Sequence, residues 1–139
     1  DSDSDGTGSL NLAASKILST TNNTLSLTAS DLALSAGSSM TSGSANTSLL
    51  TALSGTTIGL GGGTGSYSVT NTELGQINAG KLTIGSENNG TINVDGVSYS
   101  ASPLTLVASS GAGAVNFSTN ASSFSNLTSF GNLISVIFQ

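Results

Sequence analysis

The 139-residue chain lacks cysteine, histidine, arginine and tryptophan, and it contains a single proline. Without cysteine it can form neither disulfides nor thiolate metal sites, so we expect its stability to come from repeated packing. Without histidine and cysteine, neither a Ser-His-Asp nor a Cys-His catalytic arrangement can be assembled. These absences predict a protein that is not an enzyme.

Positive charge is almost absent as well. Lys16 and Lys81 are the only cationic side chains, and the formal net charge is -5, which would repel a phosphate backbone. No apolar run approaches the roughly 20 residues that span a bilayer as a helix. The sequence therefore predicts neither a nucleic-acid partner nor a membrane span.

Small polar residues make up much of what is present. The chain contains 46 serine and threonine residues, 18 glycines and 13 asparagines, a composition suited to strands and turns rather than helices. Short segments alternate apolar and polar residues, which is typical of strands with one buried face. One series of these segments begins about every 23 residues, at 10–12, 32–34, 58–60, 82–84, 104–106 and 127–129. A second series lies between them, at 25–27, 49–50, 67–69, 92–94, 115–117 and 134–136.

A fixed period of this size predicts a solenoid. A leucine-rich repeat would need a recurring Asn or Cys and a helical return segment, and neither pattern is present. The sequence favours an all-β fold, a right-handed parallel β-helix of roughly six coils with about 23 residues each. We expect residues 1–7 to be an acidic linker or cap, and residues 8–139 to be a single β-helix segment of a longer rod or fibre.

Equivalent strands would then stack in parallel, with their apolar residues pointing inward. The first series should form two adjacent ladders inside the β-helix. The residues expected in these ladders are Leu10, Leu12, Leu32, Leu34, Ile58, Leu60, Leu82, Ile84, Leu104 and Leu106.

A family resemblance rests on two neighbouring stretches. They are Thr-Glu-Leu-Gly-Gln-Ile-Asn-Ala-Gly-Lys-Leu-Thr-Ile-Gly-Ser at 72–86 and Gly-Thr-Ile-Asn-Val at 90–94. Together they resemble the repeat of filamentous-haemagglutinin-type large exoproteins and similar β-strand-repeat adhesins. The resemblance implies an extracellular right-handed β-helix, secreted or held at the cell surface, that serves as an adhesin or scaffold.

The amino-terminal residues imitate the start of a calcium loop. Asp1, Asp3 and Asp5 alternate with serine and precede Gly6, a spacing that lets carboxylate oxygens converge on a hard cation. The twelfth position is Leu12, so the closing acid of an EF-hand loop is missing. Two interpretations stand, a calcium site or an acidic linker, and the linker is favoured. Apart from calcium, no cofactor is expected.

Acidic side chains elsewhere could in principle serve a polysaccharide lyase or hydrolase. The candidates are the acids Asp31, Glu73, Glu87 and Asp95 together with the basic Lys81, and the competing interpretation, solvated charges at turns and edges, is favoured. Asparagine sequons are a separate group. Six Asn-x-Ser/Thr sequences occur, close to the number expected by chance, and Asn22 and Asn89 are the glycosylation candidates because they lie in predicted turns.

The carboxyl-terminal window is the most hydrophobic and β-prone part of the chain. Left bare, it would be an aggregation template, so something must cover it. The residues of this predicted assembly interface are Leu133, Ile134, Val136, Ile137 and Phe138. The expected partners are copies of the chain, joined end to end, or neighbouring coils of a longer chain, with host or surface glycans as further candidates.

These observations favour a structural or adhesive extracellular surface protein that forms a rod or filament. The alternative is a protein that binds or degrades polysaccharides, although bound sugars usually stack on exposed aromatic residues and this chain has two tyrosines and no tryptophan.

Overall fold

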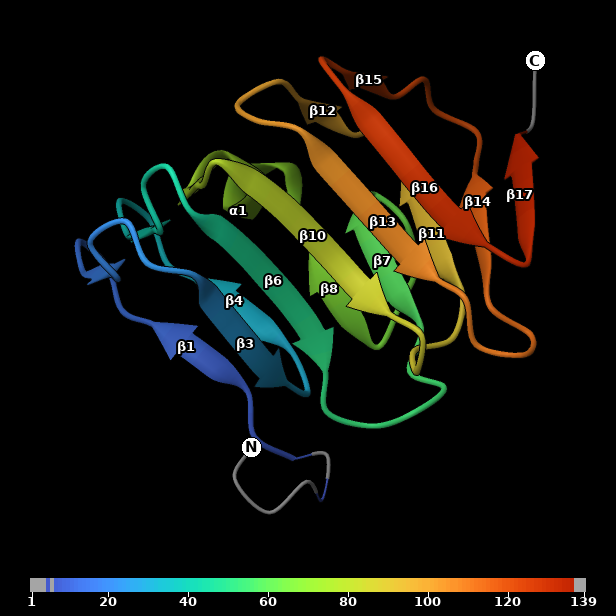
Figure 1. The fold of residues 1–139 in the computed structure, drawn as a ribbon, viewed down its shortest axis with the longest axis horizontal. Helices are drawn as coiled ribbons and strands as arrows, with labels where there is room; N and C mark the ends of the chain where they lie inside the picture. The colour runs from blue at the N-terminus through green and yellow to red at the C-terminus, as the bar shows by residue number, and fades with distance from the viewer. Residues whose placement is uncertain (1–4, 6, 137–139) are drawn as a thin grey trace.

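The structure is a computed structural model that describes residue 5 and residues 7–136. These residues form 17 β-strands and one short α-helix. Every strand pairing is parallel. Figure 1 shows the strands side by side, with the amino-terminal and carboxyl-terminal strands at opposite ends of the molecule.

Two five-stranded sheets contain ten of the 17 strands. The first sheet contains, in spatial order, β16 (Leu127–Gly131), β13 (Leu104–Ala108), β10 (Lys81–Ser86), β6 (Asn46–Thr51) and β3 (Leu25–Ala29). The second sheet contains β17 (Leu133–Val136), β14 (Ala114–Phe117), β11 (Ile92–Asp95), β7 (Ile58–Gly61) and β8 (Tyr67–Val69).

Three smaller sheets and the helix complete the described chain. β1 (Leu10–Leu12) pairs with β4 (Leu32–Leu34), and β12 (Ser98–Tyr99) pairs with β15 (Ser123–Phe124). The three-stranded sheet is formed by β2 (Ile17–Ser19), β5 (Ser39–Thr41) and β9 (Ile77–Asn78). Helix α1 (Asn71–Gly75) lies between β8 and β9 in the sequence. It is not long enough to cross a bilayer, and no other helix occurs in the part of the chain that the structure describes.

The predicted single β-helix of six equal coils is wrong, because the strands form five separate parallel sheets. Strands of the first predicted series lie in three different sheets: β1 and β4 in one, β7 in another, and β10, β13 and β16 in a third. Leu82 of β10 pairs with Thr47 of β6, 35 residues earlier, in the strand that contains the second-series segment 49–50, whereas Leu104 pairs with Leu82 at a separation of 22. The pairing separation is therefore not constant.

The change of separation has a local cause. Between β7 and β10 the chain forms β8, helix α1 and β9 instead of proceeding to the next strand of the first sheet. These residues lengthen the connection, so that β7 joins the second sheet and β10 pairs with β6. The two continuous ladders expected for the first series do not form.

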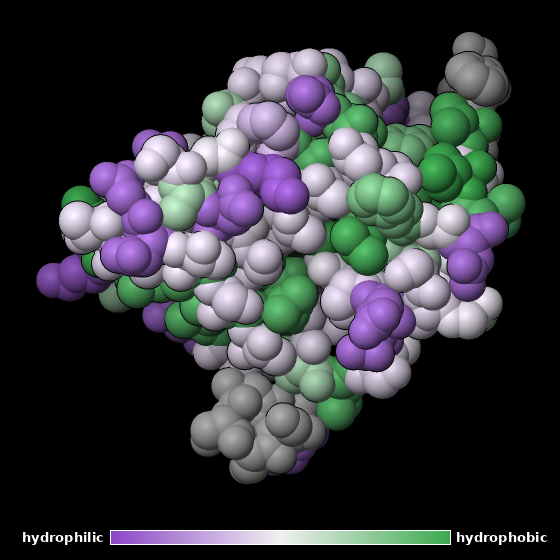
Figure 2. Space-filling model, in the orientation of Figure 1, coloured by the Kyte–Doolittle hydropathy of each residue, from purple (hydrophilic) through white to green (hydrophobic). Residues whose placement is uncertain are grey.

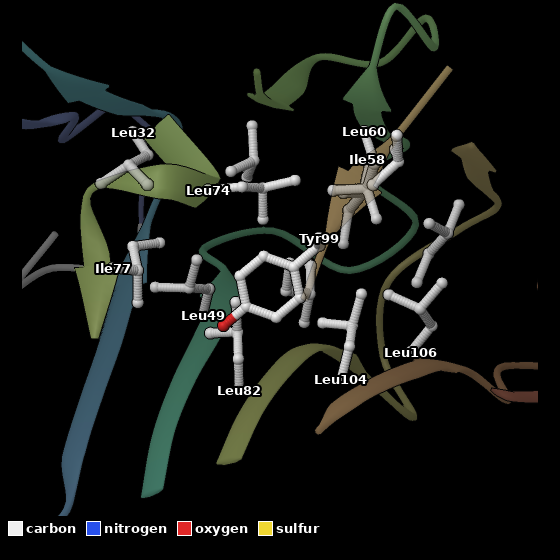
Figure 3. Close-up of a cluster of buried hydrophobic side chains, with 14 of the residues drawn as sticks. Leu32, Leu49, Ile58, Leu60, Leu74, Ile77, Leu82, Tyr99, Leu104 and Leu106 are labelled. Carbon is white, nitrogen blue, oxygen red and sulfur yellow. The ribbon is translucent and has the colours of Figure 1, made fainter. Parts of the chain in front are cut away.

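The inward orientation of the predicted core is nevertheless largely confirmed. Eight of the ten residues are buried, while Leu10 and Leu12 are partly buried against the same core. Figure 3 shows Leu49, Leu82 and Leu104 from the first sheet facing Ile58 and Leu60 from the second. The core therefore lies between the two large sheets, with an aliphatic centre to which the phenol ring of Tyr99 also contributes.

β7 and β8 are parallel neighbours joined by five residues, 62–66. A parallel pair normally needs a connection of a dozen residues or more. A connection of five residues is possible here because the loop lies directly on β7 at Gly59. A β-carbon at Gly59 would overlap the carbonyl oxygen of Gly63. Since Ile58 and Leu60 point into the core, Gly59 faces the opposite side of the sheet, and the loop covers that side.

Candidate functional site

The strands β15, β16 and β17 form what we call the C-terminal edge. Within the part of the chain that the structure describes, each is the last strand of its sheet and pairs on one side only. A strand in this position presents unpaired N–H and C=O groups, which are a template for pairing with another chain. In Figure 1 these strands lie together at one end of the molecule.

Large apolar side chains accompany these unpaired backbone groups. Of the six exposed large hydrophobic residues in the described part of the chain, four lie on the C-terminal edge: Phe130 (55% exposed), Leu133 (61%), Ile134 (48%) and Val136 (49%). Figure 2 shows strongly hydrophobic residues gathered where β16 and β17 lie. No charged residue follows Asp95 in the sequence, so the edge has none of the lysines that commonly protect an edge strand.

The exposure of Ile134 follows from its place in the second sheet. It pairs with Val115, which pairs with Ile92, and both of these residues are fully buried in the core. Ile134 occupies the same inward row, but no further strand of the described residues pairs with β17 beyond it. The predicted interface residues Leu133, Ile134 and Val136 thus lie on one edge, whereas Ile137 and Phe138 are outside the described residues.

Phe130 belongs to the same edge, although sequence reasoning missed it. It pairs with Val107, points outward on the first sheet, and precedes the hydrophobic window in the sequence. Its neighbours Ser129 and Gly131 gave no apolar pattern, and only the pairing of β16 with β13 shows that it lies at an edge.

The opposite end, which we call the N-terminal edge, consists of β1, β2 and β3. Among residue 5 and residues 7–136, each of these strands also pairs with one other strand only. Ile17 is 69% exposed, and Leu10, Leu12, Leu18 and Leu27 pack against the core while only partly buried. Both ends of the molecule therefore leave core side chains incompletely covered.

Two of the acidic candidates, Asp31 and Asp95, accept hydrogen bonds from distant segments of the chain. Asp31 accepts hydrogen bonds from the Ser68 main-chain N–H (2.8 Å) and hydroxyl (3.4 Å). Asp95 accepts from the main-chain and side-chain nitrogens of Asn120, at 2.7 and 3.0 Å. Glu87 and Lys81 are exposed. Asp31 and Asp95 thus hold together segments that are distant in the sequence.

Glu73 is buried at the start of helix α1. One carboxylate oxygen accepts hydrogen bonds from the Thr70 N–H and hydroxyl, both at 2.9 Å, and completes a capping box. The other accepts the Leu34 N–H of β4 at 3.1 Å. Burial, and then the nearby carboxylates of Asp31 and Glu73, raises the pKa of the Tyr67 phenol above its usual range. This junction joins β4, β8 and α1.

Replacing Glu73 with alanine should destabilise the fold by about 2 kcal/mol. The change removes the helix cap and leaves the buried Leu34 N–H without an acceptor. Chemical denaturation measures the effect, and Glu87→Ala, at an exposed carboxylate, is the control, expected to fall within about 0.5 kcal/mol of the parent. Equal stability of the two variants would show that the junction does not hold the helix in place.

The amino-terminal metal candidate is only partly described. Asp1 and Asp3 lie outside the described residues, and Asp5 is exposed. The Thr7 hydroxyl and main-chain N–H donate to Asp5 at 2.6 and 2.9 Å and lower the pKa of its carboxyl group. Residue 5 and residues 7–136 contain no group of three or more acidic side chains that could hold a metal ion.

The two glycosylation candidates differ in exposure. Asn22 is exposed, has a φ of 62°, and accepts the Ser44 N–H at 3.0 Å. Asn89 is fully buried, accepts the Ser86 N–H, and donates to the Gly90 carbonyl at 2.8 Å. The turn position does not expose Asn89, because its amide is hydrogen-bonded inside that turn.

A shallow hollow lies elsewhere on the surface, lined by Ser30, Asp31, Leu53, Thr56 and Ser66. Its only carboxylate is Asp31, which is already hydrogen-bonded to Ser68. Comparisons with protein-family models, curated proteins and solved structures find no match to this chain.

Proposed function

We propose that the chain is a structural, adhesive protein of the cell surface that assembles with other copies through its C-terminal edge. The observation that carries the proposal is the uncharged edge of β16 and β17, where Phe130, Leu133, Ile134 and Val136 are about half exposed or more. Edge strands and apolar side chains together provide both the backbone pairing and the hydrophobic burial that association needs.

A scaffold role accounts for the polar groups as well. The carboxylates of Asp31, Glu73 and Asp95 are bound to main-chain donors of distant segments, which stiffens the molecule instead of leaving them free for a substrate. Location outside the cell is part of the proposal. It is supported by the low fraction of charged residues and by the resemblance of residues 72–94 to exoprotein repeats.

Replacing Ile134 with lysine should abolish association without unfolding the chain. The side chain is 48% exposed at the end of an inward row, so lysine can extend into solvent in the monomer but would bury a charge in an assembly. Sedimentation over a wide concentration range, with circular dichroism to confirm folding, measures the effect. The parent chain is expected to grow in size with concentration, and the variant to remain monomeric.

Leu53→Lys is the matched control. Leu53 is 47% exposed, almost the same as Ile134, but it lies in the loop between β6 and β7 and belongs to neither set of edge strands. This variant should associate like the parent chain. A parent chain that stays monomeric at every concentration, or a control that loses association equally, would contradict the proposed function.

A further inference from the structure

The two ends of the first sheet are aligned with each other through the pairing register. Leu25 of β3 pairs with Thr47, which pairs with Leu82, then Leu104 and finally Leu127 of β16. The strands at both ends are five residues long. Leu25 and Leu127 thus occupy the same row at opposite edges.

Inward-facing and outward-facing residues also alternate in the same order along these two edge strands. Leu27 of β3 and Ser129 of β16 share the next inward row. Ser26 and Thr128 share the outward row between the two inward ones, and both are exposed. A second β3 placed beside β16 in this register keeps every inward position inward, whereas a shift by one residue would invert them.

The core is complete in the middle of the molecule and open at its two ends. Seven hydrophobic residues pack against it while only partly buried, and all lie in the first three strands or in β14 to β16. They are Leu10, Leu12, Leu18, Leu27, Phe117, Phe124 and Leu127. Contact between opposite ends would cover both groups at once, whereas contact between like ends would leave one group exposed.

Neither set of edge strands contains a charged residue. β1, β2 and β3 read Leu-Asn-Leu, Ile-Leu-Ser and Leu-Ser-Leu-Thr-Ala, and β15 to β17 lie in the uncharged region after Asp95. No like charges would therefore oppose their approach. Pairing β16 with a second β3 also continues the parallel arrangement of all other strands, while two β16 strands related by a two-fold axis perpendicular to the sheet would run antiparallel.

We propose that copies join head to tail, with β3 of one copy paired in parallel with β16 of the next and Leu25 opposite Leu127. This inference rests on the proposed function and adds the partner surface, the polarity and the register. The contact is heterologous, because it joins two different surfaces. Repeating it from copy to copy gives either a closed ring or, when the ring does not close, a polar filament.

The absence of native cysteine allows a direct test by disulfide trapping. Two single variants, Ser26→Cys and Thr128→Cys, are mixed under assembly conditions and oxidised with oxidised glutathione. In the proposed register the two α-carbons lie about 5 Å apart, the spacing of adjacent strands. That separation is within the range that a disulfide spans. We expect a covalent dimer containing one copy of each variant.

Thr28→Cys mixed with Thr128→Cys is the register control. Thr28 is exposed on the same face of β3, two residues from Ser26. The added displacement along the strand puts the two α-carbons about 8 Å apart. Since this exceeds the limit of about 7 Å, linkage should be about tenfold slower or absent. Equal linkage of the two mixtures would contradict the register.

Thr128→Cys alone tests the polarity. It should remain unlinked, and a dimer linked through two copies of this variant would overturn the head-to-tail arrangement in favour of contact between C-terminal edges. Sedimentation of the unmodified chain distinguishes failure of the head-to-tail inference from failure of the proposed function. A chain that associates without linking Ser26→Cys to Thr128→Cys refutes the inference alone, and a chain that never associates refutes both.

Discussion

Replacing Leu82 with aspartate should leave the chain unfolded at 25 °C. Leu82 is fully buried at the centre of the first sheet, between Thr47 of β6 and Leu104 of β13. An unpaired carboxylate there would have no cation to neutralise it. The one lysine on this strand is Lys81, and its side chain is exposed. We expect a loss of about 5 kcal/mol or more, comparable with the whole stability of a small domain.

Circular dichroism and thermal unfolding measure this effect, and Thr83→Asp is the control. Thr83 is the next residue of the same strand, on the outward face and on the same side as Lys81. Its carboxylate would reach solvent, so this variant should fold and melt within a few degrees of the parent. A Leu82→Asp variant that melts like the parent would show that this face of β10 is not in the core.

The periodic pattern predicted the strands more successfully than their partners. Each of the twelve predicted segments lies in a strand of the structure. Alternation, however, records which face of a strand is buried and not which strand lies beside it. Leu82 is equally compatible with Ile58 or Thr47 as a neighbour, and the structure pairs it with Thr47. The error in the fold class came from treating one average spacing as a constant pairing separation.

Short elements escaped prediction for a different reason. In β5, Met40 is fully buried but stands between Ser39 and Thr41 without a second apolar residue to reveal the alternation. Helix α1 did leave a local signal, because Thr70 and Glu73 match the Thr-x-x-Glu capping pattern. The hydrogen bond that the Leu34 N–H donates to Glu73 left no local signal in the sequence, because the two residues are 39 positions apart.

The candidate site was predictable in part. A hydrophobic window at the carboxyl-terminal end indicated Leu133, Ile134 and Val136, and composition alone was enough to find it. The N-terminal edge was not identified, because Ile17 and Leu27 have the same apolar pattern as core residues. Their incomplete burial depends on being in the last strand of a sheet, which only the strand order shows.

Replacing Gly59 with alanine should destabilise the fold by about 3 kcal/mol or more. A β-carbon at this position would overlap the Gly63 carbonyl oxygen and lie 2.9 Å from the Gly65 nitrogen. Both are backbone atoms of the loop that connects β7 to β8, so no side-chain rotation can relieve the overlap. The loop would have to lift from β7, and the pairing of β8 with β7 would be lost with it.

Chemical denaturation of Gly59→Ala beside Gly75→Ala isolates this close approach from the general effect of removing a glycine. Gly75 ends helix α1, and a β-carbon there meets no atom within 4 Å. Alanine at Gly75 should leave stability unchanged or raise it by up to about 1 kcal/mol, because alanine restricts the unfolded chain and favours the helix. If both variants were equally stable, the five-residue connection would not lie on β7, and the parallel pairing of β7 with β8 would need another route.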